Sequence, residues 1–249
     1  MLKENFSNNW YEDAFNENYI FLFDPLRTPE FTENEVDCML KLLNLPSGAK
    51  VLDLGCGYGR HSIMFRKKGF NVVGMDYSNV LLTKAKADSQ GMGIEWIQSD
   101  MRNIPFENEF DLVINNAFGY LENDNEEQIV LNQIYKCLKT NGKLLQWEIP
   151  NKLNWSKKYV TYESANMNEF LVERKSEYDF LSGKEYQSYI LSKDSNVLTE
   201  QKFAVRVFDL PELLKMYKDA GLIFESVTSL QGEPVSFDVA ELCLICSKS

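Results

Sequence analysis

The segment that most constrains this chain is Val51-Leu-Asp-Leu-Gly-Cys-Gly-Tyr-Gly-Arg60. A short apolar run containing one acid is followed by glycines at alternate positions and then by a pattern typical of a helix. Glycine lets a ligand approach the backbone closely, and the first turn of a helix carries unpaired N–H groups. The segment therefore predicts a strand, a loop that binds a nucleotide cofactor, and a helix.

From Lys50 onward, short apolar runs alternate with amphipathic segments. We expect strands at 51–54, 71–75, 94–98, 111–115 and 143–149, and helices at 60–68, 79–89 and 126–138. Strands that alternate with helices form a parallel sheet with helices on both faces. The predicted fold class is α/β, with a doubly wound, Rossmann-like sheet.

This alternation ends at Pro150. Residues 151–208 contain β-like runs at about 168–179, 184–192 and 199–208, with turn residues between them. A capped helix at 209–221 and strands at 222–229 and 239–247 follow. We therefore assign a core to 46–150 and 209–249, and a small antiparallel β insertion, a substrate cover, to 151–208.

Aromatic side chains recur at helical spacing near the N-terminus, at Trp10, Tyr11, Phe15, Tyr19 and Phe23. Thr32 and Glu35 have the spacing of a capping box, which predicts that a second helix begins there. We assign residues 1–45 to a helical lid. Aromatic faces attract cations and a lid excludes water, so Tyr11 and Tyr19 are candidate cofactor contacts; core packing is the alternative interpretation.

The charge balance argues against nucleic acid as a partner. The 249 residues include 26 basic and 37 acidic side chains, a net charge of −11, whereas binding to a phosphate backbone depends on lysine and arginine. No apolar run reaches membrane-spanning length, and the first residues do not resemble a signal peptide. We expect a cytoplasmic protein without a membrane partner, as a monomer or a homodimer.

Five scattered cysteines favour reduced thiols over a disulfide framework. Cys243 and Cys246 form a CxxC pattern, but residues three apart on a strand point to opposite faces. They are therefore poorly placed to bind a metal together, and we expect no metal site.

The residues around the glycines indicate which nucleotide the loop binds. A dinucleotide fingerprint starting at Gly55 needs a third glycine where this chain has Arg60, and Asp53 would repel a pyrophosphate. Asp76 ends the next strand, where it can accept hydrogen bonds from both ribose hydroxyls, and Asp100 follows the third strand. Three acids at successive strand ends predict a cationic adenosine ligand. Each aspartate can alternatively cap a helix or lie in a solvated loop.

Three motifs in this order and spacing resemble those of class I S-adenosylmethionine-dependent methyltransferases: Asp53-Leu-Gly-Cys-Gly-Tyr-Gly59, Met75-Asp76 and Ser99-Asp100-Met101. The resemblance covers roughly residues 36–150, and a later segment resembles the helix before that family's sixth strand. It implies a seven-stranded sheet with an antiparallel last strand. It also implies that the glycine loop holds the methionine part of the cofactor, Asp76 the ribose and Asp100 the adenine. The expected cofactor contacts are Tyr11, Tyr19, Asp53, Gly55, Cys56, Gly57, Asp76, Tyr77, Asp100, Met101 and Asn115.

The segment Asn115-Asn-Ala-Phe-Gly119 follows the fourth strand, where the crevice of such a sheet opens. We expect Asn115 near the cofactor and Phe118 near the acceptor, with turn chemistry as the alternative. Arg206 either points into the crevice and holds an anionic group of the acceptor, or lies on an exposed strand edge.

Methyl transfer requires no nucleophilic side chain, and only a hydroxyl acceptor needs a base. The nearest candidate bases are Glu148, Tyr159 and Tyr162. His61, the only histidine, lies at the wrong end of the expected cofactor and is expected to pack within the first helical turn.

The predicted function is transfer of a methyl group from S-adenosylmethionine to N or O of a small molecule by in-line displacement, with S-adenosylhomocysteine as product. Positioning and exclusion of water would supply most of the rate. The alternatives are a regulatory module that binds the cofactor without turnover, a methyltransferase that acts on a protein, and, less favoured, a nicotinamide-dependent dehydrogenase.

Overall fold

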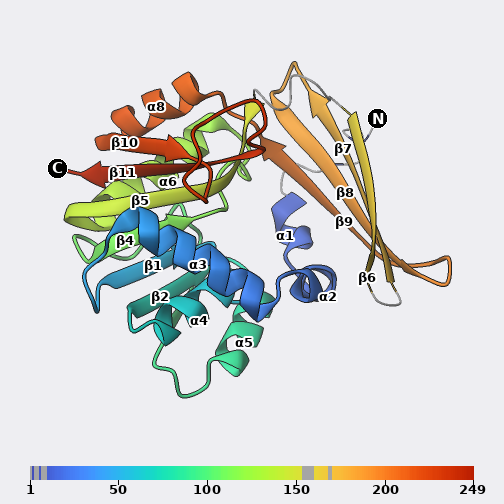
Figure 1. The fold of residues 1–249 in the computed structure, drawn as a ribbon, viewed down its shortest axis with the longest axis horizontal. Helices are drawn as coiled ribbons and strands as arrows, with labels where there is room; N and C mark the ends of the chain where they lie inside the picture. The colour runs from blue at the N-terminus through green and yellow to red at the C-terminus, as the bar shows by residue number, and fades with distance from the viewer. Residues whose placement is uncertain (1, 3–5, 7–9, 153–159, 168–169) are drawn as a thin grey trace.

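A seven-stranded sheet organises the computed structural model, which describes residues 2, 6, 10–152, 160–167 and 170–249 (Figure 1). Its strands are β1 (Lys50–Leu54), β2 (Asn71–Asp76), β3 (Glu95–Gln98), β4 (Phe110–Asn115), β5 (Leu138–Pro150), β10 (Leu222–Thr228) and β11 (Glu241–Lys248). The strand order is β10-β11-β5-β4-β1-β2-β3. The five strands from β5 to β3 pair in parallel, and β11 is antiparallel to both of its neighbours. The predicted α/β sheet with a reversed last strand is confirmed.

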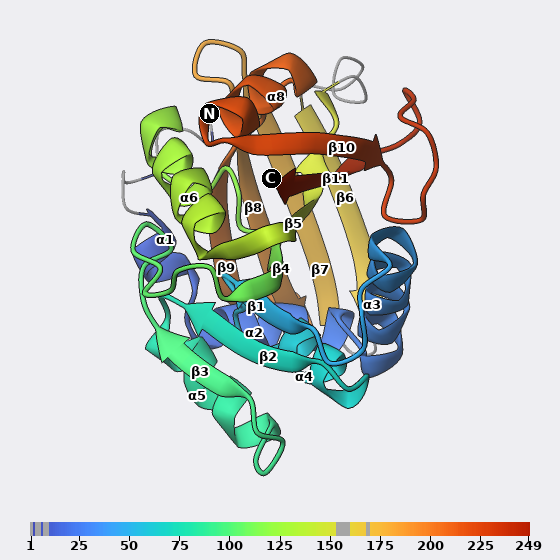
Figure 2. The same cartoon turned by 90° about the vertical axis from the view of Figure 1, so that its left-hand side faces the viewer.

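Helices cover both faces of this sheet (Figure 2). They are α3 (Pro29–Leu43), α4 (Arg60–Lys67), α5 (Asn79–Asp88), α6 (Asp124–Cys137) and α8 (Leu210–Asp219). Leu112 on β4 packs with α3 and α4 in one apolar cluster, and its neighbour Val113 packs with α6 and α8 in another. Both side chains are fully buried, so the sheet is enclosed between two helical layers.

Helix α3 begins earlier than the sequence pattern predicts. Its N-cap is Thr28, whose side-chain oxygen accepts a hydrogen bond of 3.1 Å from the N–H of Phe31. Pro29 occupies the first helical position, where its missing N–H leaves no bond unmade. The predicted start at Thr32 is therefore wrong: Thr32 lies inside the helix, and Glu35 contacts Arg60 and His61 instead of closing a capping box.

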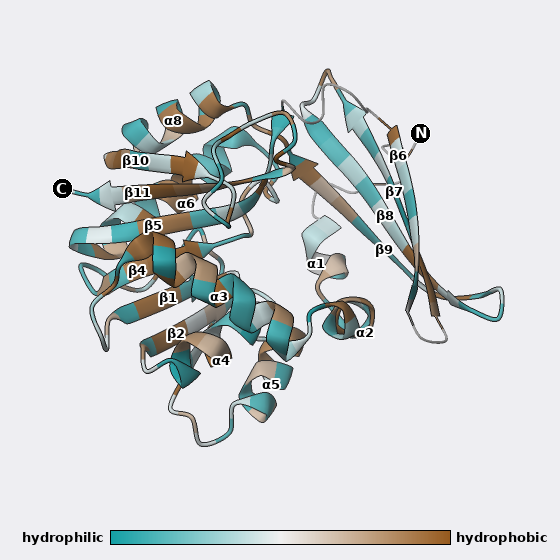
Figure 3. Ribbon diagram, in the orientation of Figure 1, coloured by the Kyte–Doolittle hydropathy of each residue, from teal (hydrophilic) through white to brown (hydrophobic). Residues whose placement is uncertain are grey.

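The segment after β5 forms a separate four-stranded antiparallel sheet, in the order β6-β7-β8-β9. Its strands are β6 (Val160–Met167), β7 (Phe170–Asp179), β8 (Lys184–Lys193) and β9 (Asn196–Arg206). The predicted antiparallel insertion is confirmed, with one strand more than the pattern indicated. In Figure 3, β1 and β4 are hydrophobic along most of their length, whereas β7 and β8 carry many polar residues.

Two short helices, α1 (Trp10–Ala14) and α2 (Glu17–Phe23), lie between the two sheets (Figure 1). A 3-10 turn, η2 (Asp24–Leu26), connects them to α3. Trp10 packs edge-on against Phe203 of β9, with ring centroids 5.8 Å apart. On the other side, the hydroxyl of Ser78 donates a hydrogen bond of 2.7 Å to the carbonyl of Phe15. The N-terminal helices therefore contact both the small sheet and the core.

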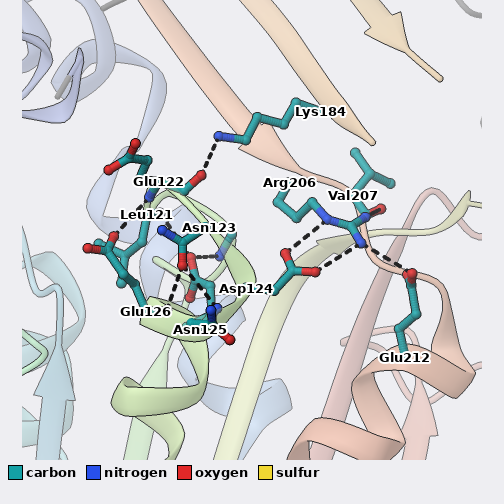
Figure 4. Close-up of polar contacts among 12 residues, drawn as sticks. Leu121, Glu122, Asn123, Asp124, Asn125, Glu126, Lys184, Arg206, Val207 and Glu212 are labelled. Carbon is teal, nitrogen blue, oxygen red and sulfur yellow. Dashed lines mark hydrogen bonds and ion pairs between the residues drawn. The ribbon is translucent and has the colours of Figure 1, made fainter. Parts of the chain in front are cut away.

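Arg206 fastens the end of β9 to the core (Figure 4). Its guanidinium pairs with Asp124 of α6 at 3.1 Å and with Glu212 of α8 at 3.2 Å. It also lies over the ring of Phe208, 4.5 Å from the centroid. The predicted substrate contact at Arg206 is corrected: these partners occupy its side chain, which does not line the cavity described below.

The five cysteines are free thiols. Cys243 belongs to the apolar cluster under α3 and α4, and Cys246 to the cluster under α6 and α8. The two thiols of the CxxC pattern therefore lie on opposite faces of the sheet. Among the residues that the structure describes, no helix is both long and apolar enough to cross a membrane.

Candidate cofactor and acceptor site

A cavity of about 410 Å³ lies between the two sheets. One wall is the glycine loop and the residues that follow β2, β3 and β4, and the opposite wall is one face of the four-stranded sheet. Aromatic residues of α1 and α2 close a third side. A cavity of this size fits a ligand of nucleoside dimensions, and it opens at the carboxyl ends of parallel strands, where open α/β sheets bind ligands.

The glycine loop presents backbone to this cavity. Gly55 has a φ of +71°, and a Cβ there would lie 2.7 Å from the Cβ of Ala117. Gly57 has a φ of +55°, and a Cβ there would have only one neighbour, a methyl group of Leu81 at 3.8 Å. Because Gly57 lines the cavity, a side chain at that position would occupy space that is open to a ligand. Cys56 lines a smaller recess of about 60 Å³ beside the loop.

Asp53 does not face the cavity as an unpaired acid. Its buried carboxylate accepts hydrogen bonds from the N–H and the hydroxyl of Ser62, at 3.0 and 2.6 Å. Ser62 lies in the first turn of α4, so Asp53 acts as a cap for that helix, the alternative weighed from the sequence. Burial raises the pKa of Asp53 to about 6, although the bonds from Ser62 oppose the shift. The carboxylate borders only the smaller recess.

Asp76 does line the main cavity, at the end of β2. One carboxylate oxygen accepts a hydrogen bond of 2.7 Å from the N–H of Gly57, and the other accepts one of 2.8 Å from the N–H of Ser78. Burial raises the pKa of Asp76 to about 6. Each oxygen keeps a second lone pair for a ligand hydroxyl. Tyr77, beside it, lines the cavity and is half exposed.

Asp100 and Met101 also line the cavity, after β3. Asp100 accepts hydrogen bonds of 2.8 and 3.0 Å from the backbone N–H and the Nε of Arg102. Burial acts to raise the pKa of Asp100, but the bonds from Arg102 outweigh it and leave the pKa lowered. Arg102 is in turn held by Glu126 at 2.8 Å. The predicted acid therefore sits in the expected place, with a partner that the sequence pattern did not indicate.

Both N-terminal tyrosines line the cavity. Tyr11 meets Tyr77 edge-on at 6.2 Å between centroids, and Tyr19 packs against Phe23 at 4.7 Å. Phe15 and Phe23 line the cavity as well, as part of the same aromatic wall. The helical spacing in the sequence predicted this wall, but not which rings would face inward.

The predicted roles of Asn115 and Phe118 need correction. Asn115 is fully buried and accepts a hydrogen bond of 2.7 Å from the N–H of Ala117, so its side chain shapes the loop and does not reach the cavity. Phe118 packs in the core against Phe208, with ring centroids 5.2 Å apart. The residues of this loop that do line the cavity are Asn116, Ala117, Tyr120 and Leu121.

Glu127 of α6 holds the same loop from behind. One of its oxygens accepts hydrogen bonds of 2.9 Å from the N–H groups of both Gly119 and Leu121. The side chain is buried, and burial raises its pKa to about 8 despite these two bonds. No feature of the sequence indicated this role, because Glu127 follows Asp124 and Glu126 in the first turn of α6, where acidic residues are common.

Of the two candidate bases that the structure describes, Glu148 lines the cavity and Tyr162 does not. Glu148 pairs with Arg27 at 3.3 Å and accepts a hydrogen bond of 3.3 Å from the side-chain amide of Asn116. Tyr162 is 64% exposed, and its hydroxyl donates a hydrogen bond to Glu173. It does not line the cavity, so the prediction that Tyr162 is a candidate base is corrected. Tyr159 lies outside the described residues.

His61 is buried, as expected, 3.2 Å from Glu35 and edge-on to Trp147. Burial lowers the pKa of His61 to about 4, because the charged ring would lose its hydration. No group of three or more histidine, cysteine, aspartate or glutamate side chains suited to a metal ion occurs in the described part of the chain.

The wall opposite the glycine loop was not predicted. Alternate residues of the small sheet face the cavity because side chains of a strand alternate between its faces. They include Thr161, Glu163, Arg174, Glu185, Gln187, Tyr189, Phe203 and Val205. Glu241, at the start of β11, and Arg27 also line this end. The cavity thus combines an aromatic and glycine-lined end with a charged end.

Comparison with known proteins agrees with this geometry. A family described as a methyltransferase domain matches residues 51–142. The putative methyltransferase YqeM of Bacillus subtilis is 26% identical over 205 residues, covering 75% of this chain and 78% of the relative. A putative methyltransferase of Geobacillus sp. (strain WCH70) is 30% identical over 136 residues, which cover 52% of this chain and 55% of that protein, so the chain spans about half of its length.

Solved structures share the fold. The CcbJ methyltransferase from Streptomyces caelestis has a TM-score of 0.77 at 17% identity, covering 89% of this chain and 91% of that one. The amino pentose methyltransferase CalS10 from Micromonospora echinaspora has a TM-score of 0.70 at 17% identity, covering 93% and 96%. The ordered motifs, the sheet topology and the methyltransferase domain matched at residues 51–142 together support a class I S-adenosylmethionine-dependent methyltransferase.

Proposed function

We propose that this chain transfers a methyl group from S-adenosylmethionine to a nitrogen or oxygen atom of a small molecule held between the two sheets. The observation that carries this proposal is a cavity of about 410 Å³ whose two ends differ in chemistry. One end has the glycine loop, Asp76 and Asp100, and the other has charged side chains of the small sheet. A cofactor and an acceptor thus have neighbouring places in one cavity.

The residues at the glycine end fit the cofactor. A Cβ at Gly57 would enter open cavity space, so the loop leaves room for a ligand against its backbone. Asp76 can accept ribose hydroxyls with its free lone pairs, and Met101 offers an apolar surface to the adenine. Tyr11 and Tyr19 can offer aromatic faces to a sulfonium. S-adenosylmethionine supplies an electrophilic methyl group on a positively charged sulfur.

The residues at the charged end would position the acceptor and exclude water. An amine acceptor needs only to reach the methyl group uncharged, whereas a hydroxyl acceptor needs a proton acceptor. Glu148 is the carboxylate among the predicted bases that lines the cavity, and we assign it that role for a hydroxyl acceptor. Enclosure between two sheets and the N-terminal helices favours positioning and desolvation as the main sources of rate.

The size of the cavity and its position between the two sheets support a small acceptor over a protein or nucleic acid. A folded protein substrate would need an open cleft, and the net charge of −11 disfavours nucleic acid. A regulatory module without turnover would need the cofactor end alone. The charged acceptor end is therefore the feature that favours catalysis over binding only.

A methyl-release assay tests this proposal. The protein is incubated with S-adenosylmethionine and a panel of small amines and alcohols, and S-adenosylhomocysteine is measured. The proposal is supported if S-adenosylhomocysteine forms only when amines, or only when alcohols, are added. If the cofactor binds tightly, no small molecule of the panel is methylated and a panel of peptides is methylated, the proposal of a small acceptor is wrong and the acceptor is a protein.

A further inference from the structure

Glu185 places a carboxylate deep in the charged end of the cavity. Its side chain is only 1% exposed, and it lies on the face of β8 that lines the cavity. One oxygen, Oε1, pairs with Arg174 at 3.3 Å. The other, Oε2, is buried and accepts no hydrogen bond of good geometry within the described part of the chain, although Ser176 and Gln187 lie near the carboxylate. A buried carboxylate oxygen in this state needs a donor.

Arg174 does not neutralise this carboxylate by itself. Its guanidinium is shared, with Glu185 at 3.3 Å and with Glu163 at 3.6 Å, and its Nε is also buried without a hydrogen-bond partner in the described residues. It lies over the ring of Tyr189, 5.6 Å from the centroid, which fixes its plane. One guanidinium therefore pairs with two carboxylates, and the net charge of these three side chains is negative when both carboxyls are ionised.

The same imbalance holds for the whole charged end. Its described cations are two, Arg27 and Arg174, and its carboxylates are four: Glu148, Glu163, Glu185 and Glu241. Arg27 pairs with Glu148 at 3.3 Å, and Glu148 also lies 4.0 Å from Arg60, which does not line the cavity, so Arg174 is left to compensate Glu163, Glu185 and Glu241. Glu241, at the exposed edge, forms no ion pair with a described residue. Burial raises the pKa of Glu185, which is the expected response of a carboxylate whose negative charge is not fully compensated.

We infer that the acceptor carries a positively charged amine and that Glu185 binds it through Oε2. An ammonium group supplies both things that this wall lacks, a hydrogen-bond donor for the buried oxygen and a positive charge among four carboxylates. A hydroxyl would supply only the donor, and an anionic group would be repelled. This inference rests on the proposed function, because it names the class of acceptor for the same cavity; the atom that receives the methyl group is a separate question.

The experiment compares amines with alcohols of the same carbon skeleton. Binding to the protein loaded with S-adenosylhomocysteine is measured by calorimetry for pairs such as cyclohexylamine and cyclohexanol, and glucosamine and glucose. We expect amines to bind at least about tenfold more tightly than their alcohol partners, since hydrogen bonds to charged groups exceed neutral ones by that order. Equal or weaker binding of every amine relative to its alcohol would overturn the inference, whatever the variants below do.

Glu185→Gln identifies the residue. It should remove most of the preference for the amine while leaving alcohol binding and the affinity for S-adenosylhomocysteine unchanged. The matched control is Glu173→Gln, because Glu173 lies on the neighbouring strand, pairs with Tyr162 and does not line the cavity. If Glu185→Gln fails to fold, Glu241→Gln at the cavity edge should give a smaller loss of the same preference. An amine preference that survives in both variants would contradict the assignment to this wall.

The two proposals fail differently. If S-adenosylhomocysteine itself does not bind, the proposed function is wrong. If it binds and amines bind no more tightly than the matching alcohols, the proposed function is retained and the inference of a positively charged amine is wrong.

Discussion

The backbone N–H of Gly57 donates a hydrogen bond of 2.7 Å to the carboxylate of Asp76 and joins the glycine loop to the end of β2. The bond is internal, so Asp76 fixes the loop before any ligand binds. A substitution at either residue should therefore affect cofactor binding through the shape of the loop as well as through direct contacts.

Gly57→Ala should abolish binding of S-adenosylmethionine at concentrations that saturate the wild-type protein. Its φ of +55° disfavours any side chain, and the added Cβ would also enter the cavity. Gly91→Ala is the matched control, with a φ of +79° and no atom within 4 Å of the added Cβ. We expect both variants to lose about 1–2 kcal/mol of stability from strain, and only Gly57→Ala to lose the ligand. Calorimetry and thermal unfolding measure the two effects, and equal ligand affinity in both variants would contradict the loop assignment.

Tyr11→Ala should weaken S-adenosylmethionine binding by about tenfold, whereas Tyr11→Phe should keep most of it, because the contact expected is with the face of the ring. Phe31→Ala serves as a control, since Phe31 is an exposed aromatic residue of α3 outside the cavity. Affinities from calorimetry test this. An equal loss in Tyr11→Phe and Tyr11→Ala would show that the hydroxyl, and not the ring, makes the contact.

Glu127 should make stability fall with rising pH. Burial raises its native pKa from the ordinary value of 4.5 to about 8, so between these values the folded protein holds a proton that the unfolded chain has lost. The contribution is present in full below the lower value and is lost as the pH rises through about 8. Its slope is up to about 1.4 kcal/mol per pH unit.

Glu127→Gln should remove that slope, because the amide oxygen can still accept from Gly119 and Leu121 and does not titrate. Glu127→Ala should be destabilised by about 2–4 kcal/mol, since two buried N–H groups lose their acceptor. Urea unfolding at several pH values between 5 and 9 measures both. The exposed Glu122→Gln should keep the wild-type slope, and a Gln variant with an unchanged slope would rule Glu127 out as its source.

Arg206→Gln should lower stability by about 1–2 kcal/mol without changing cofactor affinity or the Michaelis constant for the acceptor. The residue pairs with Asp124 and Glu212 outside the cavity, so its loss loosens the junction of β9 with the core. Denaturant unfolding and steady-state kinetics separate the two effects. A rise in the Michaelis constant with unchanged stability would restore the substrate contact that the sequence suggested.

The core and the cofactor end were predictable because local signals agree there. Glycines that need positive φ, acids at strand ends and apolar strands that alternate with helices each indicate the same parallel sheet. The loop after β4 shows the limit. Asn115 and Asn116 are identical in type and adjacent, but only Asn116 reaches the cavity, because neighbouring positions point in opposite directions.

The charged wall could not be predicted, because both faces of β8 carry a mixture of polar and apolar residues. Glu185 and Tyr186 are adjacent and both buried, but Glu185 lies in the cavity wall, whereas the ring of Tyr186 packs against Phe6 with centroids 5.0 Å apart. Which face points inward depends on how the N-terminal helices dock on the small sheet, a long-range contact that alternation within one strand does not encode. The same holds for Arg206, whose partner Asp124 lies 82 residues away in the sequence.

The most direct test of the central claim is a calorimetric titration of the wild-type protein and Asp76→Ala with S-adenosylmethionine. We predict that the wild-type protein binds S-adenosylmethionine and S-adenosylhomocysteine with micromolar affinity. We predict that Asp76→Ala does not bind S-adenosylmethionine. Absence of binding to the folded wild-type protein, together with tight binding of a nicotinamide dinucleotide, would contradict the account.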